Sequence, residues 1–200
     1  MSKKLLIVFV KNTKLGTVKT RLAKSIGDAA ALKIYSALVR HTKHVSNSMT
    51  MDTHVYFSTN NGAEKWNNAS INIQVGSDLG ERMSDAFKKG FDQGYSQIIL
   101  IGSDLPDISN VIIEKGFDAL LDNTVVFGPA KDGGYYLVGM NEFQSCIFEN
   151  KSWSTSKLLE ETLIELHDNH TKTALIDILN DIDTFEDLKT FPKFLKLISK

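Results

Sequence analysis

The stretch LLIVFVKNTKLGTVKTRLA, residues 5–23, joins an apolar run directly to a basic loop that contains a glycine. Six consecutive apolar residues suit a strand that is buried on both faces of a sheet, and they are too few to cross a bilayer. Lys11 follows the run without a small-residue cleavage site, so we interpret the run as a buried strand and not as a secretion signal.

The remainder of the chain repeats this order of strand, polar segment and helix. Short runs of β-branched or aromatic residues predict strands at 5–10, 53–58, 71–75, 97–102, 124–128 and 135–139. Longer stretches with helical spacing predict helices at 29–45, 79–91, 111–121 and 157–166. The alternation predicts an α/β sandwich with a mostly parallel sheet. No linker, repeat or low-complexity segment interrupts it, so residues 1–200 are expected to form one domain.

Composition excludes several classes of function. The 200 residues are 42% hydrophobic and 24% charged with a net charge of −1, which predicts no nucleic-acid partner, no polybasic membrane surface and no membrane span. The only cysteine, Cys146, excludes an internal disulfide and is expected to pack in the core. The pairs His41/His44 and His167/His170 are expected on exposed helix faces. Together these features predict a cytoplasmic enzyme, with its oligomeric state left open.

The loop after the first run is the first candidate for binding. Residues 11–21 carry four basic side chains around Gly16, among them Lys19 and Arg21. A glycine lets backbone amides approach an anion, and lysine and arginine add full charge, so the loop is a candidate phosphate cradle. A solvated basic loop is the alternative. Val18 precedes Lys19 where the P-loop of nucleoside triphosphatases requires glycine, so that class is rejected.

A second candidate follows the run at 97–102. Asp104 comes at the end of a predicted strand, where α/β sheets bind ligands, and a carboxylate there suits a divalent ion. A role as a helix cap is the alternative, but residues 106–109 offer a better helix start. We therefore expect Asp104 to be a metal ligand, with Ser103 beside it in the nucleotide site.

The segment GPAKDGGYYLVG, residues 128–139, permits two interpretations. Asp-Gly and Gly-Gly favour a hairpin turn, because glycine reaches positive φ without strain. The same segment follows a strand, so Asp132 and Gly133 can also face a ligand. We expect both roles, with Asp132 binding a metal or orienting an acceptor.

Two further segments carry weaker signals. In NDIDTFEDL, residues 180–188, Thr184 and Asp187 are expected to form a helix cap, and Asp183 is a second metal candidate. A phosphatase that uses Asp181 or Asp183 as nucleophile is an alternative, although that signature normally follows the first strand. At the start of the helix at 79–91, Gly80 and Arg82 are candidates for nucleotide contact or for a simple helix start.

Several segments together resemble one known family. In chain order they are LIVFVKNTKLGTVKTRLA (6–23), VGSDLGERMSDAF (75–87), ILIGSDLP (99–106), VVFGPAKDGGYYLVG (125–139), WST (153–155) and DIDTFEDL (181–188). They resemble the nucleotide-diphospho-sugar-transferase-like bacterial proteins known as glycosyltransferase A or arsenosugar-biosynthesis glycosyltransferases. These are related in fold to the molybdenum-cofactor and phospholactate guanylyltransferases. The resemblance implies a Rossmann-like GT-A fold, a three-layer α/β/α sandwich.

The resemblance also implies a mechanism. It places Gly16, Lys19 and Arg21 at the phosphates, Asp104 at a Mg²⁺ or Mn²⁺ ion, and Asp132 between donor and acceptor. The expected activity is glycosyl transfer from a nucleotide sugar to a small-molecule acceptor. Nucleotidyl transfer from a nucleoside triphosphate, and a non-catalytic nucleotide-binding protein, are the two alternatives.

Overall fold

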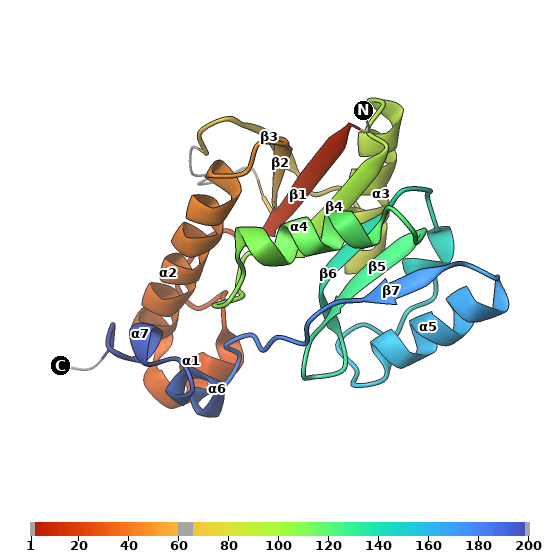
Figure 1. The fold of residues 1–200 in the computed structure, drawn as a ribbon. Helices are drawn as coiled ribbons and strands as arrows, with labels where there is room; N and C mark the ends of the chain where they lie inside the picture. The colour runs from red at the N-terminus through yellow and green to blue at the C-terminus, as the bar shows by residue number, and fades with distance from the viewer. Residues whose placement is uncertain (1–2, 60–65, 199–200) are drawn as a thin grey trace.

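A computed structural model describes residues 3–59 and 66–198, which form a mixed sheet between two layers of helices (Figure 1). Within these residues the sheet has seven strands in the order β3-β2-β1-β4-β6-β5-β7. Their bounds are β1 (Lys4–Val10), β2 (Asp52–Phe57), β3 (Ala69–Ile73), β4 (Gln97–Gly102), β5 (Val125–Pro129), β6 (Tyr135–Met140) and β7 (Thr173–Leu175). All neighbouring pairs are parallel except those that involve β6. The predicted α/β sandwich with a mostly parallel sheet is confirmed.

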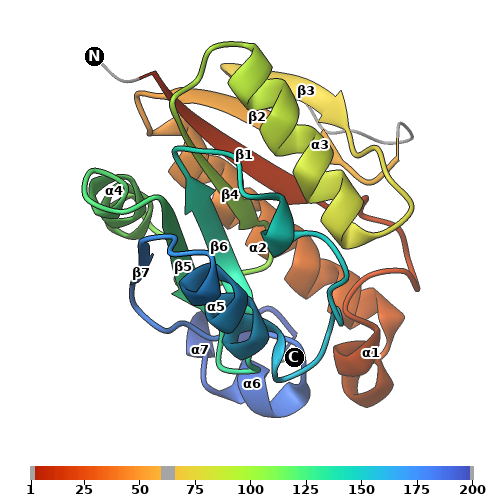
Figure 2. The same ribbon diagram turned by 90° about the vertical axis from the view of Figure 1, so that its right-hand side faces the viewer.

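The four longest helices cover the two faces of the sheet, whereas three short helices contribute to a third buried cluster. The helices are α1 (Thr20–Ile26), α2 (Asp28–Asn47), α3 (Leu79–Asp92), α4 (Asn110–Ala119), η1 (Ser145–Ile147), α5 (Leu158–Asp168), α6 (Phe185–Lys189) and α7 (Pro192–Leu195). Figure 2 shows α3 and α5 in front of the sheet and α2 behind it, and α4, at the left of that view, packs in the same buried cluster as α2. The three-layer arrangement follows from the side-chain period of the strands.

Strand β1 shows how the sequence builds the two cores. Successive side chains of a strand point to opposite faces. Leu6, Val8 and Val10 therefore pack in one buried cluster with residues of α2 and α4. Leu5, Ile7 and Phe9 pack in a second cluster with residues of α3 and α5. The continuous apolar run at 5–10 thus serves both cores at once.

The polarity of the strands brings their following loops to one edge. Because β6 is antiparallel to both β4 and β5, the carboxyl ends of β1, β4, β5 and β7 share an edge with the start of β6. In a sheet of this kind ligands bind at that edge. The segments after residues 10, 102, 129 and 175 are therefore gathered there.

The predicted elements all occur, with ends displaced by up to two residues. The expected strand at 71–75 is β3 at Ala69–Ile73, an edge strand whose side chains are only partly buried, so its apolar pattern is weak. Four short elements were not predicted, namely α1, η1, β7 and α7, whereas the start of α6 was expected from the cap formed by Thr184 and Asp187. None of them exceeds seven residues, which is too short for a periodic pattern to emerge.

Other expectations from composition can be compared with the structure. None of the helices in residues 3–59 and 66–198 has both the length and the apolar character needed to cross a membrane. Cys146 is half-buried against the second core cluster. His44, His167 and His170 are exposed as expected, but His41 is half-buried and its Nε2 lies 2.9 Å from the carbonyl oxygen of Ile108.

Candidate functional site

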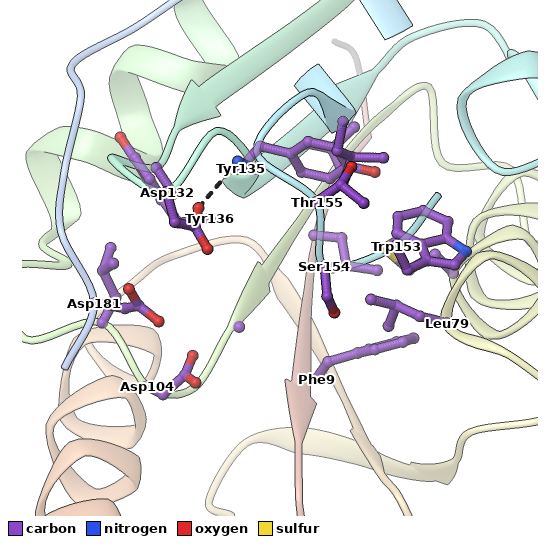
Figure 3. A pocket seen from close by; sticks show the side chains of 18 residues that line it. Phe9, Leu79, Asp104, Asp132, Tyr135, Tyr136, Trp153, Ser154, Thr155 and Asp181 are labelled. Atoms are coloured by element: carbon purple, nitrogen blue, oxygen red, sulfur yellow. Dashed lines mark hydrogen bonds between the residues drawn. The ribbon is translucent and has the colours of Figure 1, made fainter. Parts of the chain in front are cut away.

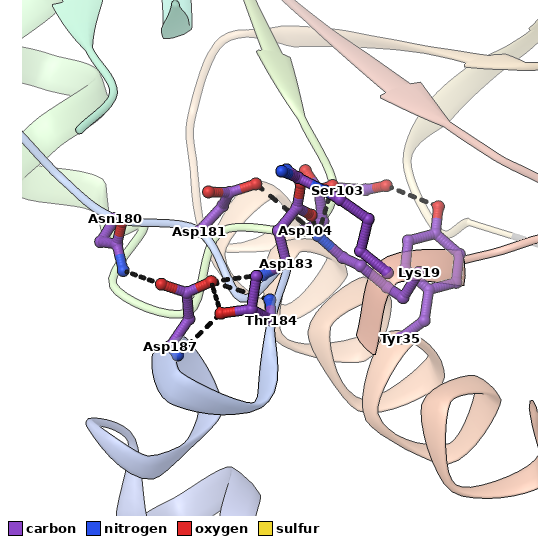
Figure 4. A network of polar contacts seen from close by, with 10 residues as sticks. Lys19, Tyr35, Ser103, Asp104, Asn180, Asp181, Asp183, Thr184 and Asp187 are labelled. Atoms are coloured by element: carbon purple, nitrogen blue, oxygen red, sulfur yellow. Dashed lines mark hydrogen bonds and ion pairs between the residues drawn. The ribbon is translucent and has the colours of Figure 1, made fainter. Parts of the chain in front are cut away.

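Lys19 lies at the centre of a charged cluster at the carboxyl edge of the sheet (Figure 4). Its Nζ lies 2.9 Å from Asp104 Oδ2, 2.7 Å from Asp183 Oδ1 and 3.8 Å from Asp181 Oδ2, and its side chain is only 4% exposed. Burial opposes the charge, but the three carboxylates outweigh it and raise the pKa of Lys19. The ammonium is therefore held as a buried cation.

The backbone of Lys19 explains how its side chain reaches this place. Lys19 has φ 48° and ψ 46°, the left-handed conformation, directly before the first residue of α1. That conformation is unfavourable for a residue with a Cβ and often marks a functional position. Arg21, two residues further along the chain, remains 61% exposed and donates a hydrogen bond to Asp183.

The three aspartates come from two segments that are distant in sequence. Asp104 follows β4, and Asp181 and Asp183 follow β7. Within the described residues they form a group whose carboxylate oxygens lie within 4.8 Å of one another. Burial and the neighbouring carboxylates raise the pKa of Asp181 to about 7. Asp183 is also desolvated, but its contacts with Lys19 and Arg21 lower its pKa.

This group fits a divalent cation. Mg²⁺ and Mn²⁺ prefer oxygen ligands, and carboxylates are the strongest that a protein offers. A cation, the Lys19 ammonium, already lies between the three carboxylates. Burial is the main cause of the raised pKa of Asp181, and the carboxylates of Asp183 and Asp104 raise it further, against the effect of Lys19.

The capping box of α6 holds Asp183 in place. Thr184 Oγ1 accepts a hydrogen bond from the backbone N–H of Asp187, and the Asp187 carboxylate accepts one from the backbone N–H of Thr184. The same carboxylate also accepts from the backbone N–H of Asp183 at 3.2 Å. The expected helix cap is confirmed, and it fixes the segment that carries the acidic cluster.

A buried hydroxyl pair ties the first loop to the loop after β4. The backbone N–H of Lys11 donates to the hydroxyl of Tyr35 at 2.9 Å, and that hydroxyl lies 3.1 Å from Ser103 Oγ. Burial raises the pKa of Tyr35 to about 12, so the hydroxyl stays protonated. Ser103 thus faces Tyr35 and helps to position Asp104.

Two hollows meet at Asp104. The smaller one, of about 120 Å³, is lined by the residues of the basic loop, Tyr35 and Asp183. The larger one, of about 260 Å³, extends from Asp104 and Asp181 past Asp132 to Trp153 (Figure 3). The charged cluster therefore separates a polar hollow from a mostly apolar cavity.

Asp132 lies at the tip of the turn between β5 and β6, on the wall of the larger cavity. Its Oδ1 accepts a hydrogen bond from the backbone N–H of Gly134 at 3.0 Å, which stabilises the turn. Among the described residues, Asp132 does not belong to the acidic group of Asp104, Asp181 and Asp183. Gly133 has φ 91°, and a Cβ there would lie 2.0 Å from the carbonyl oxygen of Ser156. The space on the Cβ side of Gly133 is thus filled by the backbone of Ser156.

The remaining candidate glycines and Arg82 have structural contacts. A Cβ on Gly80 would lie 2.3 Å from the carbonyl oxygen of Phe148, so this glycine allows α3 to pack closely. Arg82 donates through Nε to the carbonyl oxygen of Gly76 at 3.0 Å and supports the turn before α3. Gly16 has φ 76° and makes the bend of the basic loop.

Residues 41–155 match the family of uncharacterized proteins conserved in bacteria known as DUF2064. The chain belongs to this family. Among curated protein sequences, none matches the chain. The structure of this DUF2064 protein superposes with a TM-score of 0.89 on a crystal structure from Desulfovibrio desulfuricans G20 that is provisionally named a nucleotide-diphospho-sugar transferase. The two are 30% identical over 95% of this chain and 86% of the other.

More distant structures share the fold of this DUF2064 protein. A cytidylyltransferase from Leptospira borgpetersenii is 16% identical, with a TM-score of 0.58 over 99% of this chain and 93% of the other. The manganese complex of Rv0371c from Mycobacterium tuberculosis H37Rv is 11% identical, with a TM-score of 0.51 over 94% and 98%. The GT-A-like, nucleotide-diphospho-sugar-transferase fold that the resemblance implied is confirmed.

The sequence gives only weak signals for two of the three members of the acidic group. Asp104 was recognisable because it directly follows an apolar run, whereas Asp181 and Asp183 follow a three-residue strand that the sequence does not reveal. The aromatic wall of the larger cavity was also missed, since Phe9 and Trp153 are distant in sequence. The apolar Phe9 at the end of β1, next to the basic loop, was the available signal.

Proposed function

We propose that this DUF2064 protein is a single-domain, divalent-metal-dependent transferase that transfers a glycosyl group from a nucleotide sugar to a small acceptor. One observation carries the proposal. Two basic side chains and three carboxylates, from three segments of the chain, meet at the carboxyl edge of the sheet between two hollows. A nucleotide sugar needs a site for its phosphates beside a site for the sugar and the acceptor.

The phosphates of the donor belong on the basic side. Lys11, Lys19 and Arg21 line the smaller hollow, and arginine can bind a phosphate through two parallel hydrogen bonds. In the absence of phosphate, Lys19 and Arg21 are satisfied by Asp183. When the donor binds, its phosphates give Lys19 and Arg21 a second anionic partner besides Asp183.

Asp104, Asp181 and Asp183 would hold the divalent ion. When bound, such an ion neutralises the charge that develops on the departing nucleoside diphosphate. The fold-related manganese complex supports Mn²⁺ as one candidate. The positive charges of Lys19 and Arg21 stabilise the same negative charge on the departing nucleoside diphosphate.

Asp132 is proposed to act on the acceptor. It lies on the cavity wall outside the acidic group, and the hydrogen bond from Gly134 orients its carboxylate. In the reaction the acceptor oxygen forms a bond to the anomeric carbon, and the bond from that carbon to the phosphate oxygen breaks. The acceptor proton passes to the Asp132 carboxylate as general base.

Nucleotidyl transfer is a second candidate, because the smaller hollow suits a longer phosphate chain. Lys11 is exposed at its rim in addition to Lys19 and Arg21, and a fold-related structure is a cytidylyltransferase. In that reaction the acceptor oxygen attacks the first phosphorus of a nucleoside triphosphate and pyrophosphate leaves.

A panel of nucleoside triphosphates and nucleotide sugars, with and without Mn²⁺, tests the proposal by thermal shift and then by turnover. A donor at one hundred times its Kd adds about 2.7 kcal/mol to stability. We expect a nucleotide sugar to give the largest metal-dependent increase in melting temperature and to be turned over. If the protein is instead a nucleotidyltransferase, a nucleoside triphosphate should give both results. Metal-dependent binding without turnover of any donor would indicate the non-catalytic binding protein.

Asp104→Asn tests the assignment of the site. We expect it to lose the metal-dependent shift and to lower turnover by a factor of 100 or more, on the order of a lost transition-state contact. Asp177→Asn is the matched control. Asp177 also follows β7, but its Oδ2 lies 2.7 Å from Lys115 Nζ and it is not part of the charged cluster. Full turnover by Asp104→Asn would contradict the assignment.

A further inference from the structure

The larger cavity has a strongly asymmetric lining. Figure 3 shows Asp104, Asp132 and Asp181 on one side, and Phe9, Leu79 and Trp153 on the other. The rest of the lining is mostly aliphatic or aromatic and includes Met83, Leu100, Leu105, Tyr135, Val138 and Leu158. A ligand in this cavity therefore meets an apolar wall on one side and carboxylates on the other.

No cationic side chain lines this cavity. Among its 18 lining residues, all within the described ranges, there is no lysine, arginine or histidine. Lys19 faces the carboxylates and lines the smaller hollow. Lys131 and Lys157 are exposed neighbours of lining residues, but neither lines the cavity. Because Lys19 already pairs with Asp104 and Asp181, a phosphate group in this cavity of the metal-free protein would meet carboxylates and no cation on the lining, which is unfavourable.

The polar groups that are present suit a hydroxyl group. Carboxylates accept hydrogen bonds from an alcohol, and the hydroxyl of Ser154 can donate to its oxygen. The hydroxyl of Thr155 already donates to the carbonyl oxygen of Ser152 at 2.9 Å and can only accept. Tyr136 is engaged, because its hydroxyl donates to the carbonyl oxygen of Asp177 at 2.8 Å. The aromatic rings of Phe9, Tyr135 and Trp153 offer surface for an apolar body.

We propose that the acceptor is an uncharged alcohol with an aromatic or aliphatic body, and that phosphorylated acceptors are excluded from the cavity. This inference rests on the proposed function in one respect, the use of the cavity by an acceptor. It goes further in naming the chemical class of that acceptor. The carboxylate side receives the hydroxyl, and the wall formed by Phe9, Leu79 and Trp153 receives the apolar body.

Tryptophan fluorescence measures occupancy of the cavity without turnover. The chain has two tryptophans, of which Trp153 lines the cavity and Trp66 is 5% exposed in the core cluster on the other face of the sheet. The probes are phenyl β-glucoside and its 6-phosphate, which differ only by the phosphate group. Trp153→Phe is the control that should abolish the signal.

We expect phenyl glucoside to change the fluorescence saturably and to bind at least about tenfold more tightly than its phosphate, given the cost of placing like charges together. Leu79→Lys places a cation on the wall at a residue that is 44% exposed, so the variant is expected to fold. It should reverse the preference. Equal or tighter binding of the phosphate by the unmodified chain, or no binding of either probe, would overturn the inference.

The same samples separate this inference from the proposed function. If phenyl glucoside binds as expected but no nucleotide gives a metal-dependent thermal shift, the transferase proposal fails and the assignment of the cavity stands. If nucleotides bind and the phosphorylated probe is preferred, the transferase proposal stands and the acceptor class is wrong.

Discussion

Lys19 combines two features that are unfavourable in isolation, a left-handed backbone and a buried charge. Each is costly, and such features persist where the surrounding structure compensates them. Here the three carboxylates of the acidic group offset the cost of burying the Lys19 ammonium, and the ammonium reduces the repulsion between the carboxylates. The residue therefore acts as an internal counter-ion for a site that suits a metal.

Replacement of Lys19 by methionine should expose this relationship. We expect the metal-free variant to lose about 2 kcal/mol of unfolding free energy, less than for a fully buried ion pair, because the aspartates are 26–35% exposed. Mn²⁺ should stabilise the variant more than the unmodified protein, since no ammonium competes for the carboxylates. Urea denaturation with and without Mn²⁺ measures both effects.

Lys115→Met is the matched control for that experiment. The Lys115–Asp177 pair has the same 2.7 Å contact, but both side chains are about half exposed. Its loss should cost less than about 1 kcal/mol and leave the effect of Mn²⁺ unchanged. An equal Mn²⁺ effect in Lys19→Met and the unmodified protein would contradict the role of Lys19 as a counter-ion.

Asp181 gives a pH dependence whose sign can be stated. Its folded-state pKa, about 7, lies above the ordinary pKa of an aspartate side chain, so the folded protein binds the proton more tightly than the unfolded chain does. Stability contributed by protonated Asp181 is therefore lost as pH rises from about 4 through 7. In metal-free protein, the stability of the unmodified chain relative to Asp181→Asn should fall between pH 5 and pH 8.

Denaturation of both proteins at the two pH values provides the measurement. The histidines, whose titration also affects stability in this range, are common to both proteins and cancel in the difference. A relative stability that stays constant or rises with pH would show that Asp181 is ionised throughout and that the acidic group is better compensated than its geometry indicates.

At the level of elements, the sequence predicts what is long and periodic and misses what is short. The run at 5–10 and the helices α2 and α3 were recognisable because many residues repeat one pattern. Strand β7 has three residues that are partly buried or exposed, so no pattern identifies it. Since β7 carries the chain to Asp181 and Asp183, the acidic group depends on tertiary pairing that local sequence does not encode.

The turn between β5 and β6 depends on Gly133 for two separate reasons, its positive φ and its contact with Ser156. Gly133→Ala should cost at least about 3 kcal/mol, combining left-handed strain with steric overlap. Gly94→Ala separates the two terms, because Gly94 has φ 83° and nothing within 4 Å of a Cβ. It should cost only about 1 kcal/mol. Equal losses in denaturation would show that the contact with Ser156 is unimportant.

The capping box of α6 should affect metal binding as well as stability. Thr184→Ala removes the hydroxyl that accepts from Asp187 and should cost about 1 kcal/mol. Because Asp183 is the preceding residue, Mn²⁺ affinity measured by calorimetry should also fall severalfold. Ser109→Ala removes the N-cap of α4 and should lower stability without changing Mn²⁺ affinity. Unchanged affinity in Thr184→Ala would show that the cap does not position Asp183.

At the scale of the whole molecule, the sheet brings together segments that lie far apart in sequence. Lys19 contacts Asp104 and Asp183 across separations of 85 and 164 residues. The antiparallel β6 places the Asp132 turn at the same edge, on the same side of the larger cavity as Asp104 and Asp181. The fold therefore provides one position where phosphates, a metal ion and an acceptor can meet.

The central claim is that Asp104, Asp181 and Asp183 form a divalent-metal site beside a nucleotide. Anomalous diffraction tests it most directly, with crystals that contain Mn²⁺ and the nucleotide that gives the largest thermal shift. We expect an anomalous peak between the three carboxylates, the nucleotide phosphates next to it, and Lys19 Nζ moved from Asp104 toward those phosphates. A nucleotide bound elsewhere, or a Mn²⁺ peak away from these aspartates, would contradict the account.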